Sequence, residues 1–332
     1  MGGVNCVILA AGDGTRMHAR SSKVLCEVAE KPMLLWVTDA AAAAGVTDVC
    51  CVISNPDVER ALAGRHPVFW QTERHGTAHA VKTASVFLES HRGQNTLILF
   101  GDAPFMDKDT IAASLEQHLR TGASQTVISA FVEDPHGYGR IVRSTDGTVD
   151  AIVEELDCSD EQRKIREINS GAGWYRTDDL IEALGQIKNN NKKGEYYLTD
   201  TVAVFRSLAK RVDAFTAASP SVTLGANSPA DLLALNDIAV RQIQDRHLAA
   251  GVHLISRDGV VIGPDVTIEP GAVIMPSTVI RGHSKIGAFS VIGPNTLLTD
   301  SVIGERCEVV SCVFSGCSLE DDCRPAPFTV YP

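Results

Sequence analysis

Short apolar segments alternate with stretches of helical pattern over residues 4 to about 217. The first segment, Val4 to Ile8, is rich in β-branched residues and too short for a typical helix, as expected of a buried strand in a parallel sheet. Strands are predicted at 4–9, 49–54, 67–71, 96–101, 125–132 and 167–176. This alternation predicts an α/β domain with a largely parallel sheet.

Two helices of this region are marked by the residues at their ends. One is predicted from Pro32 to Ala44, with Pro32 at the first helical position and Gly45 directly after the helix. The other is predicted to be capped by Asp109 and to end at Gly122.

A third helix is predicted over 228–251. Ser228-Pro229 is a capped start with proline at the first helical position, and Gly251 closes the helix. A chain of 332 residues exceeds what one hydrophobic core usually serves, so two domains are expected. We interpret 228–251 as a linker helix between a first domain, 1–227, and a second, 252–332.

Beyond this helix the apolar pattern changes to a period of six residues. Neither a helix, with a period of about 3.6, nor a strand, with a period of about 2, gives this pattern, whereas a hexapeptide β-helix does. About four coils are expected in 252–332. Ile303 follows Leu298 by five residues instead of six, and Val309 again follows Ile303 by six. This spacing predicts an irregularity near 299–300. The positions in phase are Ile262, Ile268, Ile274, Ile280, Ile286, Ile292 and Leu298.

Composition and charge narrow the class of protein. The formal net charge of −11 disfavours a nucleic-acid-binding protein, which needs a basic surface, and means that local cations must attract anionic substrates. No signal peptide is apparent, and no stretch approaches the ~20 apolar residues of a membrane span. Since the nine cysteines are an odd number without secretory context, we expect reduced thiols and a cytoplasmic protein.

Four of the cysteines, Cys307, Cys312, Cys317 and Cys323, lie close together in the sequence. A zinc site would usually pair its ligands as C-x2-4-C, and the intervals here are 5, 5 and 6 residues. Small apolar side chains on a β-helix are therefore the favoured interpretation.

A loop with two glycines follows the first predicted strand. Gly12 and Gly14 have no Cβ, so backbone N–H groups can approach phosphate oxygens there, and Arg16 and Lys23 add two cations. Gly-x-Gly alone would indicate only an ordinary turn, but the added cations favour a site for phosphoryl or nucleotidyl transfer. Asp102 follows another predicted strand, and because open α/β sheets bind ligands at the carboxyl ends of their strands, it can face this loop.

The segment from Leu9 to Leu25 resembles the signature of the sugar-1-phosphate nucleotidylyltransferases, and further motifs in order resemble the N-terminal half of the bifunctional GlmU family. The resemblance covers residues 4 to 230. It implies a Rossmann-like (GT-A-like) nucleotidyltransferase domain, followed by a left-handed parallel β-helix that is commonly homotrimeric. The further motifs are Gln71–His79, Phe100–Pro104, Asp134–Ile141, Ile152–Glu155, Asp160–Arg163, Glu167–Gly171, Gly194–Asp200 and Gly225–Asn227.

The activity implied by the resemblance is Mg²⁺-dependent formation of UDP-N-acetylglucosamine and pyrophosphate from UTP and N-acetylglucosamine-1-phosphate. This product is a precursor of bacterial envelope polymers such as peptidoglycan and lipopolysaccharide. In-line attack of the sugar phosphate on the α-phosphorus needs positioning and cations, not a protein nucleophile. Arg16 suits the triphosphate because its planar fork can hold two oxygens, and Lys23 can neutralise the other anion. By resemblance, Asp102 and Asn227 are the ligands of Mg²⁺, which usually takes one or two from the protein.

The resemblance also implies the residues that contact the substrates. Gln71 can read the carbonyl–imide edge of uracil, because its amide is both donor and acceptor. Phe100 and Gly101 flank Asp102, and the N-acetylglucosamine unit would be held by Gly139, Glu154 and Asn169. The residues expected on the uracil, ribose and phosphate side are Leu9, Ala10, Ala11, Gly12, Gly14, Gln71, Gly76 and Thr77.

The sequence departs from the family pattern at three positions. Ser22 stands where proline usually precedes the lysine, Phe100 replaces an expected tyrosine, and Asp13 adds a negative charge inside the loop. None removes a group that the chemistry needs, but rate and sugar preference depend on them. Two alternatives stay open: a nucleotidylyltransferase for another sugar-1-phosphate such as glucose-1-phosphate, and a non-catalytic paralogue that binds nucleotide-sugar.

The second activity of the bifunctional family, acetyl transfer, is expected to be absent from these 332 residues. Pro325 to Pro332 resembles the start of the segment that supplies the first arginine of that site, and Arg324 lies out of register with it. A base is needed to deprotonate the glucosamine amine, and neither His253 nor His283 occupies a matching position.

Overall fold

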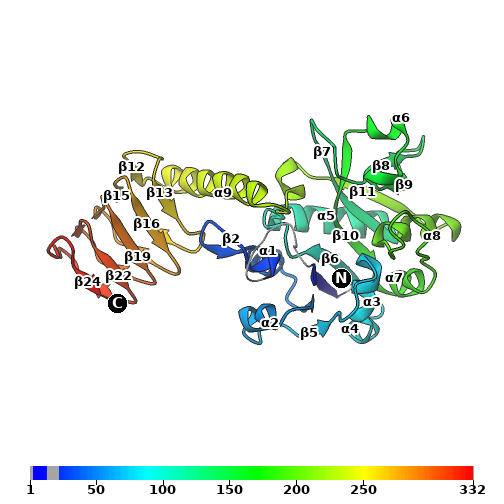
Figure 1. The fold of residues 1–332 in the computed structure, drawn as a ribbon, viewed down its shortest axis with the longest axis horizontal. Helices are drawn as coiled ribbons and strands as arrows, with labels where there is room; N and C mark the ends of the chain where they lie inside the picture. Colours follow the sequence, from blue (N-terminus) through cyan, green and yellow to red (C-terminus); the bar gives the residue numbers. More distant parts are fainter. Residues whose placement is uncertain (1–2, 13–21, 332) are drawn as a thin grey trace. The chain divides into compact units, whose positions relative to one another are not determined.

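The computed structural model describes residues 3–12 and 22–331. Asp13, Gly14 and Arg16 of the predicted loop lie outside the described residues. The chain divides into two compact units (Figure 1). The first comprises Met1–Cys26 and Pro32–Ser228, and the second comprises Glu27–Lys31 and Pro229–Pro332.

The described part of the first unit contains a nine-stranded sheet. Its main strand order is β11-β7-β10-β6-β1-β4-β5, with β8 and β9 attached beside β10. The pairings of β1 with β4 and β6, of β4 with β5 and of β7 with β11 are parallel, whereas β10 is antiparallel to both of its neighbours. The strands are β1 (Val4–Ala10), β4 (Val49–Ile53), β5 (Val68–Trp70), β6 (Asn95–Phe100), β7 (Gln125–Phe131), β8 (Arg140–Arg143), β9 (Val149–Val153), β10 (Glu167–Arg176) and β11 (Val212–Thr216).

All six predicted strands are present, and each bound lies within one residue of the predicted one. The prediction missed β8, β9 and β11. These strands carry polar side chains among the apolar ones, for example Asp150 in β9 and Asp213 in β11, so they lack the continuous apolar run of a central strand.

Helices cover both faces of the sheet. Side chains alternate along β1, so that Val7 and Leu9 enter one core while Cys6, Ile8 and Ala10 enter the other. The first core is closed by α3 (Thr77–Thr83), α4 (Ser85–Ser90), α7 (Thr177–Leu184) and α8 (Thr201–Ser207). The second is closed by α1 (Met33–Ala43), α2 (Pro56–Leu62) and α5 (Lys108–Thr121). A short α6 (Asp160–Arg163) follows β9.

Two predicted helix starts are wrong by one or two residues. Pro32 is the N-cap of α1 and not its first residue, with an extended ψ of 134°. Asp107, not Asp109, caps α5, because its side chain accepts from the backbone N–H groups of Asp109 and Thr110. The predicted C-terminal glycine is confirmed, since Gly122 takes a left-handed conformation with φ 62°.

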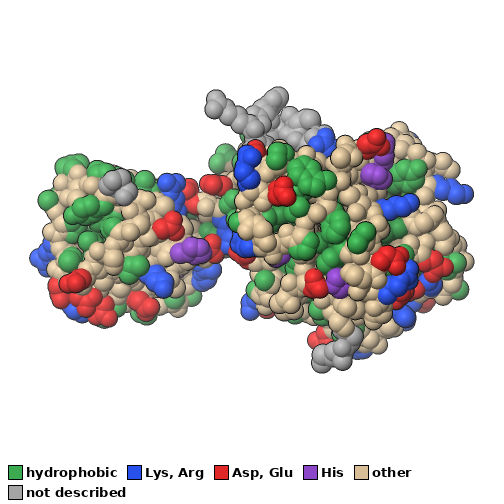
Figure 2. Space-filling view, turned by 90° about the horizontal axis from the view of Figure 1, so that it is seen from below, with side chains coloured by type: hydrophobic (Ala, Val, Ile, Leu, Met, Phe, Trp, Pro, Cys, Tyr) green, Lys and Arg blue, Asp and Glu red, His purple; other side chains and the backbone are tan. Residues whose placement is uncertain are grey.

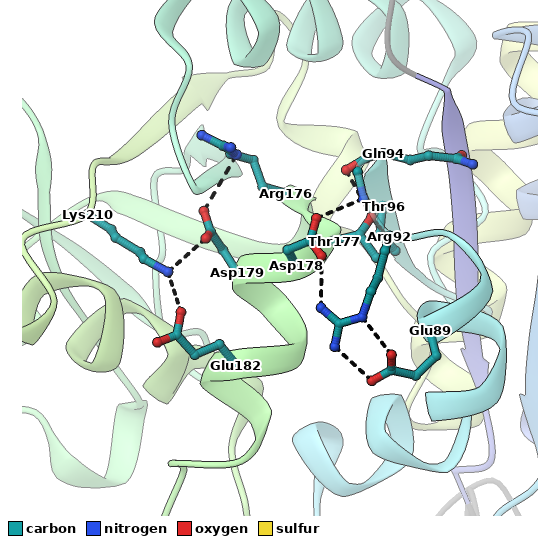
Figure 3. Close-up of polar contacts among 11 residues, drawn as sticks. Glu89, Arg92, Gln94, Thr96, Arg176, Thr177, Asp178, Asp179, Glu182 and Lys210 are labelled. Atoms are coloured by element: carbon teal, nitrogen blue, oxygen red, sulfur yellow. Dashed lines mark hydrogen bonds and ion pairs between the residues drawn. The ribbon is translucent and has the colours of Figure 1, made fainter.

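A polar network holds the start of α7 (Figure 3). Asp178 accepts from Arg92 at 2.8 Å and from the backbone N–H of Gly93 at 2.7 Å. Thr177 is hydrogen-bonded at 2.8 Å to Thr96 of β6, so the network joins the helix to the centre of the sheet. On the other side, Lys210 forms ion pairs with Asp179 and with Glu182.

The second unit is built on the long helix α9 (Pro229–Ala249) and a parallel β-helix of the left-handed hexapeptide type (Figure 1). Its strands form three parallel sheets in the described residues: β12-β15-β18-β21, β13-β16-β19-β22-β24 and β14-β17-β20-β23. The strands are β12 (His253–Leu254), β13 (Val260–Ile262), β14 (Thr267–Ile268), β15 (Val273–Ile274), β16 (Thr278–Arg281), β17 (Lys285–Ile286), β18 (Val291–Ile292), β19 (Thr296–Thr299), β20 (Val302–Ile303), β21 (Glu308–Val309), β22 (Val313–Ser315), β23 (Ser318–Leu319) and β24 (Val330–Tyr331).

The six-residue pattern places its aliphatic side chains in vertical columns. Ile262 pairs with Ile280, and Ile280 with Leu298, each 18 residues apart. The predicted irregularity is confirmed, because Ile286 pairs with Ile303, 17 residues away. A second shortening was not foreseen: the fully buried Phe314 follows Val309 by five residues and continues the column of Leu298.

A hairpin from early in the chain belongs to this second unit. Strands β2 (Glu27–Val28) and β3 (Lys31–Pro32) flank it, and the Ala29 N–H donates to Asn236 of α9 at 2.9 Å. Lys31 pairs with Asp265 at 2.9 Å, and Arg281 pairs with Glu30 at 3.1 Å. Sequence patterns gave no sign of this pairing, because the partners lie more than 200 residues apart.

Acidic and basic side chains are interspersed on the face that Figure 2 shows, without a continuous basic surface on that face. Within the described part of the chain, no helix is long and apolar enough to cross a membrane. All nine cysteines lie in that part, and each is a free thiol. Burial raises the pKa of Cys51 to about 12, so this thiol is far from ionising at neutral pH.

Candidate active site

The site is organised by two neighbouring parallel strands, β1 and β6. Their carboxyl ends lie side by side, and the Gly101 N–H donates to the Leu9 carbonyl at 2.9 Å. Gly12 and Asp102 leave these two strands at the same edge of the sheet. Gly12 and Lys23, the described ends of the predicted loop segment, line one cavity together with Asp102.

Lys23, Asp102 and Asn227 converge at this edge. The Lys23 ammonium lies 2.5 Å from an Asp102 carboxylate oxygen and donates at 3.0 Å to the side-chain oxygen of Asn227. The side chains of Lys23 and Asp102 are only 11% and 24% exposed. Gly225 brings the Asn227 segment close, because a Cβ at residue 225 would lie 3.0 Å from the Asp102 carbonyl oxygen.

This arrangement fits a divalent cation with a sparse protein shell. The oxygens of Asp102 and Asn227 both reach one nitrogen, so they already converge on a position of positive charge. Carboxylate and amide oxygens are suitable ligands for Mg²⁺, which leaves its other positions to phosphates and water. No group of three or more His, Cys, Asp or Glu side chains in residues 3–12 and 22–331 forms a closed metal site.

A cavity of about 220 Å³ lies over the carboxyl ends of β1 and β6. It brings together nine residues that the sequence assigned to the substrates, together with others that it did not. The predicted residues in its wall are Leu9, Ala11, Gly12, Lys23, Gln71, Gly76, Thr77, Phe100 and Asp102.

Arg74 is a functional candidate that the sequence analysis missed. It lines the same cavity, and its guanidinium donates to the Ala11 carbonyl and to the Ser54 hydroxyl, each at 3.1 Å. It therefore ties the segment after β1 to the loop after β5. A single arginine within a sequence motif does not by itself indicate a function. The position of Arg74 between two strand ends that meet at the site does indicate one.

Gly76 forms the start of α3 and cannot be replaced without strain. Its φ is 107°, and a Cβ there would lie 2.5 Å from the Tyr196 carbonyl oxygen. The same carbonyl accepts from the Ala78 N–H at 2.9 Å, and the Thr77 hydroxyl accepts from the Leu198 N–H at 2.9 Å. These contacts join α3 to the segment 196–198.

Gln71 follows β5 and is only 5% exposed. Its backbone N–H continues the sheet by donating to Ile53 at 2.8 Å. Its side-chain nitrogen lies 3.1 Å from Nδ1 of His79 in α3. Burial and the neighbouring His75 lower the pKa of His79.

A second cavity of about 260 Å³ adjoins the first and shares Thr77 and Phe100 with it. It is lined by the three residues predicted to hold the sugar, Gly139, Glu154 and Asn169. Glu154 accepts from the Thr199 hydroxyl at 3.0 Å, and burial raises the pKa of its carboxyl. Thr199 also lines this cavity and was not predicted, because a single hydroxyl carries no pattern in the sequence.

Three predicted residues in the described part of the chain, Ala10, Gly101 and Asn227, line neither cavity. Ala10 is buried in the core against α1, and Gly101 packs against Ala10 and Leu34. Ala10 and Gly101 each lie between two residues that line the first cavity, Leu9 and Ala11 in one case and Phe100 and Asp102 in the other. Asn227 joins the site through its contact with Lys23, and the predicted Gly14 and Arg16 lie outside the described residues.

Comparisons with known proteins agree with this architecture. Residues 6–168 match the MobA-like NTP transferase domain, and residues 259–294 match bacterial transferase hexapeptide repeats. The bifunctional protein GlmU of Thermoanaerobacter pseudethanolicus is 38% identical over 330 residues, covering 99% of this chain and 72% of the relative. That of Bacillus velezensis is 37% identical over 324 residues, covering 97% of this chain and 71% of the relative. The chain therefore belongs to the GlmU family, with an NTP transferase domain followed by hexapeptide repeats.

Proposed function

We propose that the chain is a Mg²⁺-dependent uridylyltransferase that forms UDP-N-acetylglucosamine and pyrophosphate from UTP and N-acetylglucosamine-1-phosphate. The observation that carries this proposal is the pair of adjoining cavities with a common wall at Thr77 and Phe100. One cavity contains the cation Lys23 and a base-reading amide, and the other contains polar groups suited to sugar hydroxyls. Two substrates bound side by side in this way can react directly with each other.

The reaction needs two anions to approach. A phosphate oxygen of the sugar phosphate attacks the α-phosphorus of UTP in line, the bond to the β-phosphate breaks, and pyrophosphate leaves. Lys23 and Arg16 would supply positive charge to the phosphates, where charge develops in the transition state. No protein nucleophile is required, so positioning and electrostatics account for the proposed catalysis.

Mg²⁺ would be held by Asp102 and Asn227, and when bound it would supply positive charge to the phosphate oxygens. The chain itself orients these two ligands through Lys23, which contacts both. In the sugar cavity, Glu154 offers acceptors to hydroxyls, and the Asn169 side chain is oriented by the Gly171 N–H, which donates to it at 2.9 Å.

A panel of substrates tests this proposal. Purified protein is incubated with Mg²⁺, one of UTP, CTP, ATP, GTP and dTTP, and one of several sugar-1-phosphates, and pyrophosphate release is measured. The expected best pair is UTP with N-acetylglucosamine-1-phosphate. Preference for glucose-1-phosphate would identify another sugar specificity, and nucleotide-sugar binding without pyrophosphate release would identify a non-catalytic paralogue; either result contradicts the proposal.

A further inference from the structure

The amide of Gln71 contacts His79, which does not itself line the cavity over β1 and β6. The Gln71 side-chain nitrogen lies 3.1 Å from Nδ1 of His79, the third residue of α3. An amide nitrogen only donates, so Nδ1 must be the acceptor, and the proton of a neutral His79 is then on Nε2.

This contact removes an ambiguity in the amide. An amide can turn over and exchange its oxygen with its nitrogen at little cost when its surroundings do not distinguish them. Turned over, Gln71 would place its oxygen against Nδ1 of His79. The hydrogen bond would then require the neutral imidazole to carry its proton on Nδ1, its less stable tautomer, so the turned amide is disfavoured.

The order of the two amide atoms matters for base recognition. Uracil presents an N3–H donor beside a carbonyl acceptor, whereas cytosine presents an N3 acceptor beside an amino donor. One amide orientation complements uracil, and the opposite orientation complements cytosine. A freely turning glutamine would therefore accept both bases.

We infer that His79 is a specificity-determining positioning residue, which holds the Gln71 amide in one orientation and so makes the nucleotide cavity select uracil over cytosine. This inference rests on the proposed function, since it takes Gln71 as the residue that reads the base. His79 itself acts through Gln71 and does not need to touch the nucleotide.

The groups around His79 set its protonation. The ring centroid of His75 lies 5.1 Å from that of His79. Glu73 and Lys82 also act electrostatically on His79. Tyr196, from the segment that packs against α3, lines a cavity together with both histidines and Lys82. Burial, His75 and Lys82 lower the pKa of His79 while Glu73 opposes them, so the neutral acceptor form is present at neutral pH. Protonation would turn Nδ1 into a donor and favour the opposite amide orientation.

Four proteins test this inference: wild type, His79→Ala, His79→Asn and the control His75→Ala. The measured quantity is the ratio of kcat/KM for UTP to that for CTP at about pH 8, with N-acetylglucosamine-1-phosphate. His79→Ala should lower the ratio by about tenfold, the effect of losing one orienting hydrogen bond. His79→Asn should recover most of it, because its side-chain oxygen can stand near the position of Nδ1. His75→Ala should leave it unchanged, since His75 pairs with Glu73 and not with Gln71.

A pH profile supplies a readout that a purely structural role would not change. Because the pKa of His79 is lowered, the pH must fall well below about 6 to protonate it. Lowering the pH from about 8 to about 5 should reduce the UTP/CTP ratio of the wild type but not that of His79→Asn. An unchanged ratio in a folded, active His79→Ala protein would overturn the inference and leave the proposed function standing. A wild-type protein without a preference for UTP would overturn both.

Discussion

Lys23 and Asp102 form an ion pair of 2.5 Å at the point where the first and central strands of the sheet end. The pair joins the predicted phosphate-binding cation to a predicted metal ligand. Both side chains are more than three-quarters shielded from solvent, so removing one leaves the charge of the other unbalanced in a shielded place. The two residues therefore form one functional unit.

Substitution of either residue, or of Arg16, should slow the reaction strongly. Lys23→Ala, Asp102→Ala and Arg16→Ala are each expected to reduce pyrophosphate release by ~10² to 10³, the usual effect of losing a charge that stabilises the transition state. Lys164→Ala is the matched control, because Lys164 is 70% exposed and pairs only with Glu161 among the ion pairs of the described residues. Near-normal turnover in a folded Asp102→Ala protein would contradict the site assignment.

Glu154→Gln should separate stability from sugar binding. Burial raises the pKa of Glu154, so its contribution to stability is fullest at acid pH and is lost as the pH rises through the raised pKa. At neutral pH the ionised carboxylate therefore lowers the stability of the fold. Glutamine can still accept the hydrogen bond from Thr199 but carries no charge. The substitution should therefore raise Tm at pH 7.5 and leave it nearly unchanged at pH 4.

The same substitution should weaken sugar binding. Loss of a charged acceptor is expected to raise KM for the sugar phosphate about tenfold while KM for UTP stays within about twofold. Equal effects on both KM values would mean that Glu154 does not belong to the sugar side of the site.

Gly76→Ala should weaken UTP binding and lower the stability of the protein. A Cβ at this position meets the Tyr196 carbonyl at 2.5 Å on a backbone with φ 107°, and a strained residue of this kind costs about 1–3 kcal/mol. We expect a lower Tm and a higher KM for UTP. Gly64→Ala is the control, because it has a similar positive φ of 71° but open space around its Cβ; an equal loss of UTP affinity there would point to a general effect.

The β-helix should mediate self-association. Its faces carry exposed apolar side chains such as Ile255 and Phe289, which are 61% and 67% exposed in the single chain. Flat repeated faces of this type can close into a ring when the contact is heterologous. Light scattering of the full chain should give three times the mass of 35.5 kDa, and a monomer at micromolar concentration would contradict a homotrimer.

The sequence predicted what depends on local pattern. Continuous apolar runs identified the central strands, and the six-residue period identified the β-helix together with its first shortened coil. Asp109 was wrongly chosen as a helix cap because Asp107 and Asp109 have the same chemistry, and only the extended backbone of Asp107 distinguishes them. Arg74, Thr199 and the pairing of Ala29 with Asn236 could not be predicted, because each depends on residues that only the folded chain brings together.

The proposed reaction transfers a uridylyl group directly to the sugar phosphate. It is tested by incubating the protein with Mg²⁺, UTP and N-acetylglucosamine-1-phosphate whose three terminal phosphate oxygens carry ¹⁸O, and analysing the products by mass spectrometry. We expect UDP-N-acetylglucosamine that retains all three labelled oxygens, with an equal amount of unlabelled pyrophosphate. Failure to form this product, or label appearing in the pyrophosphate, would contradict it.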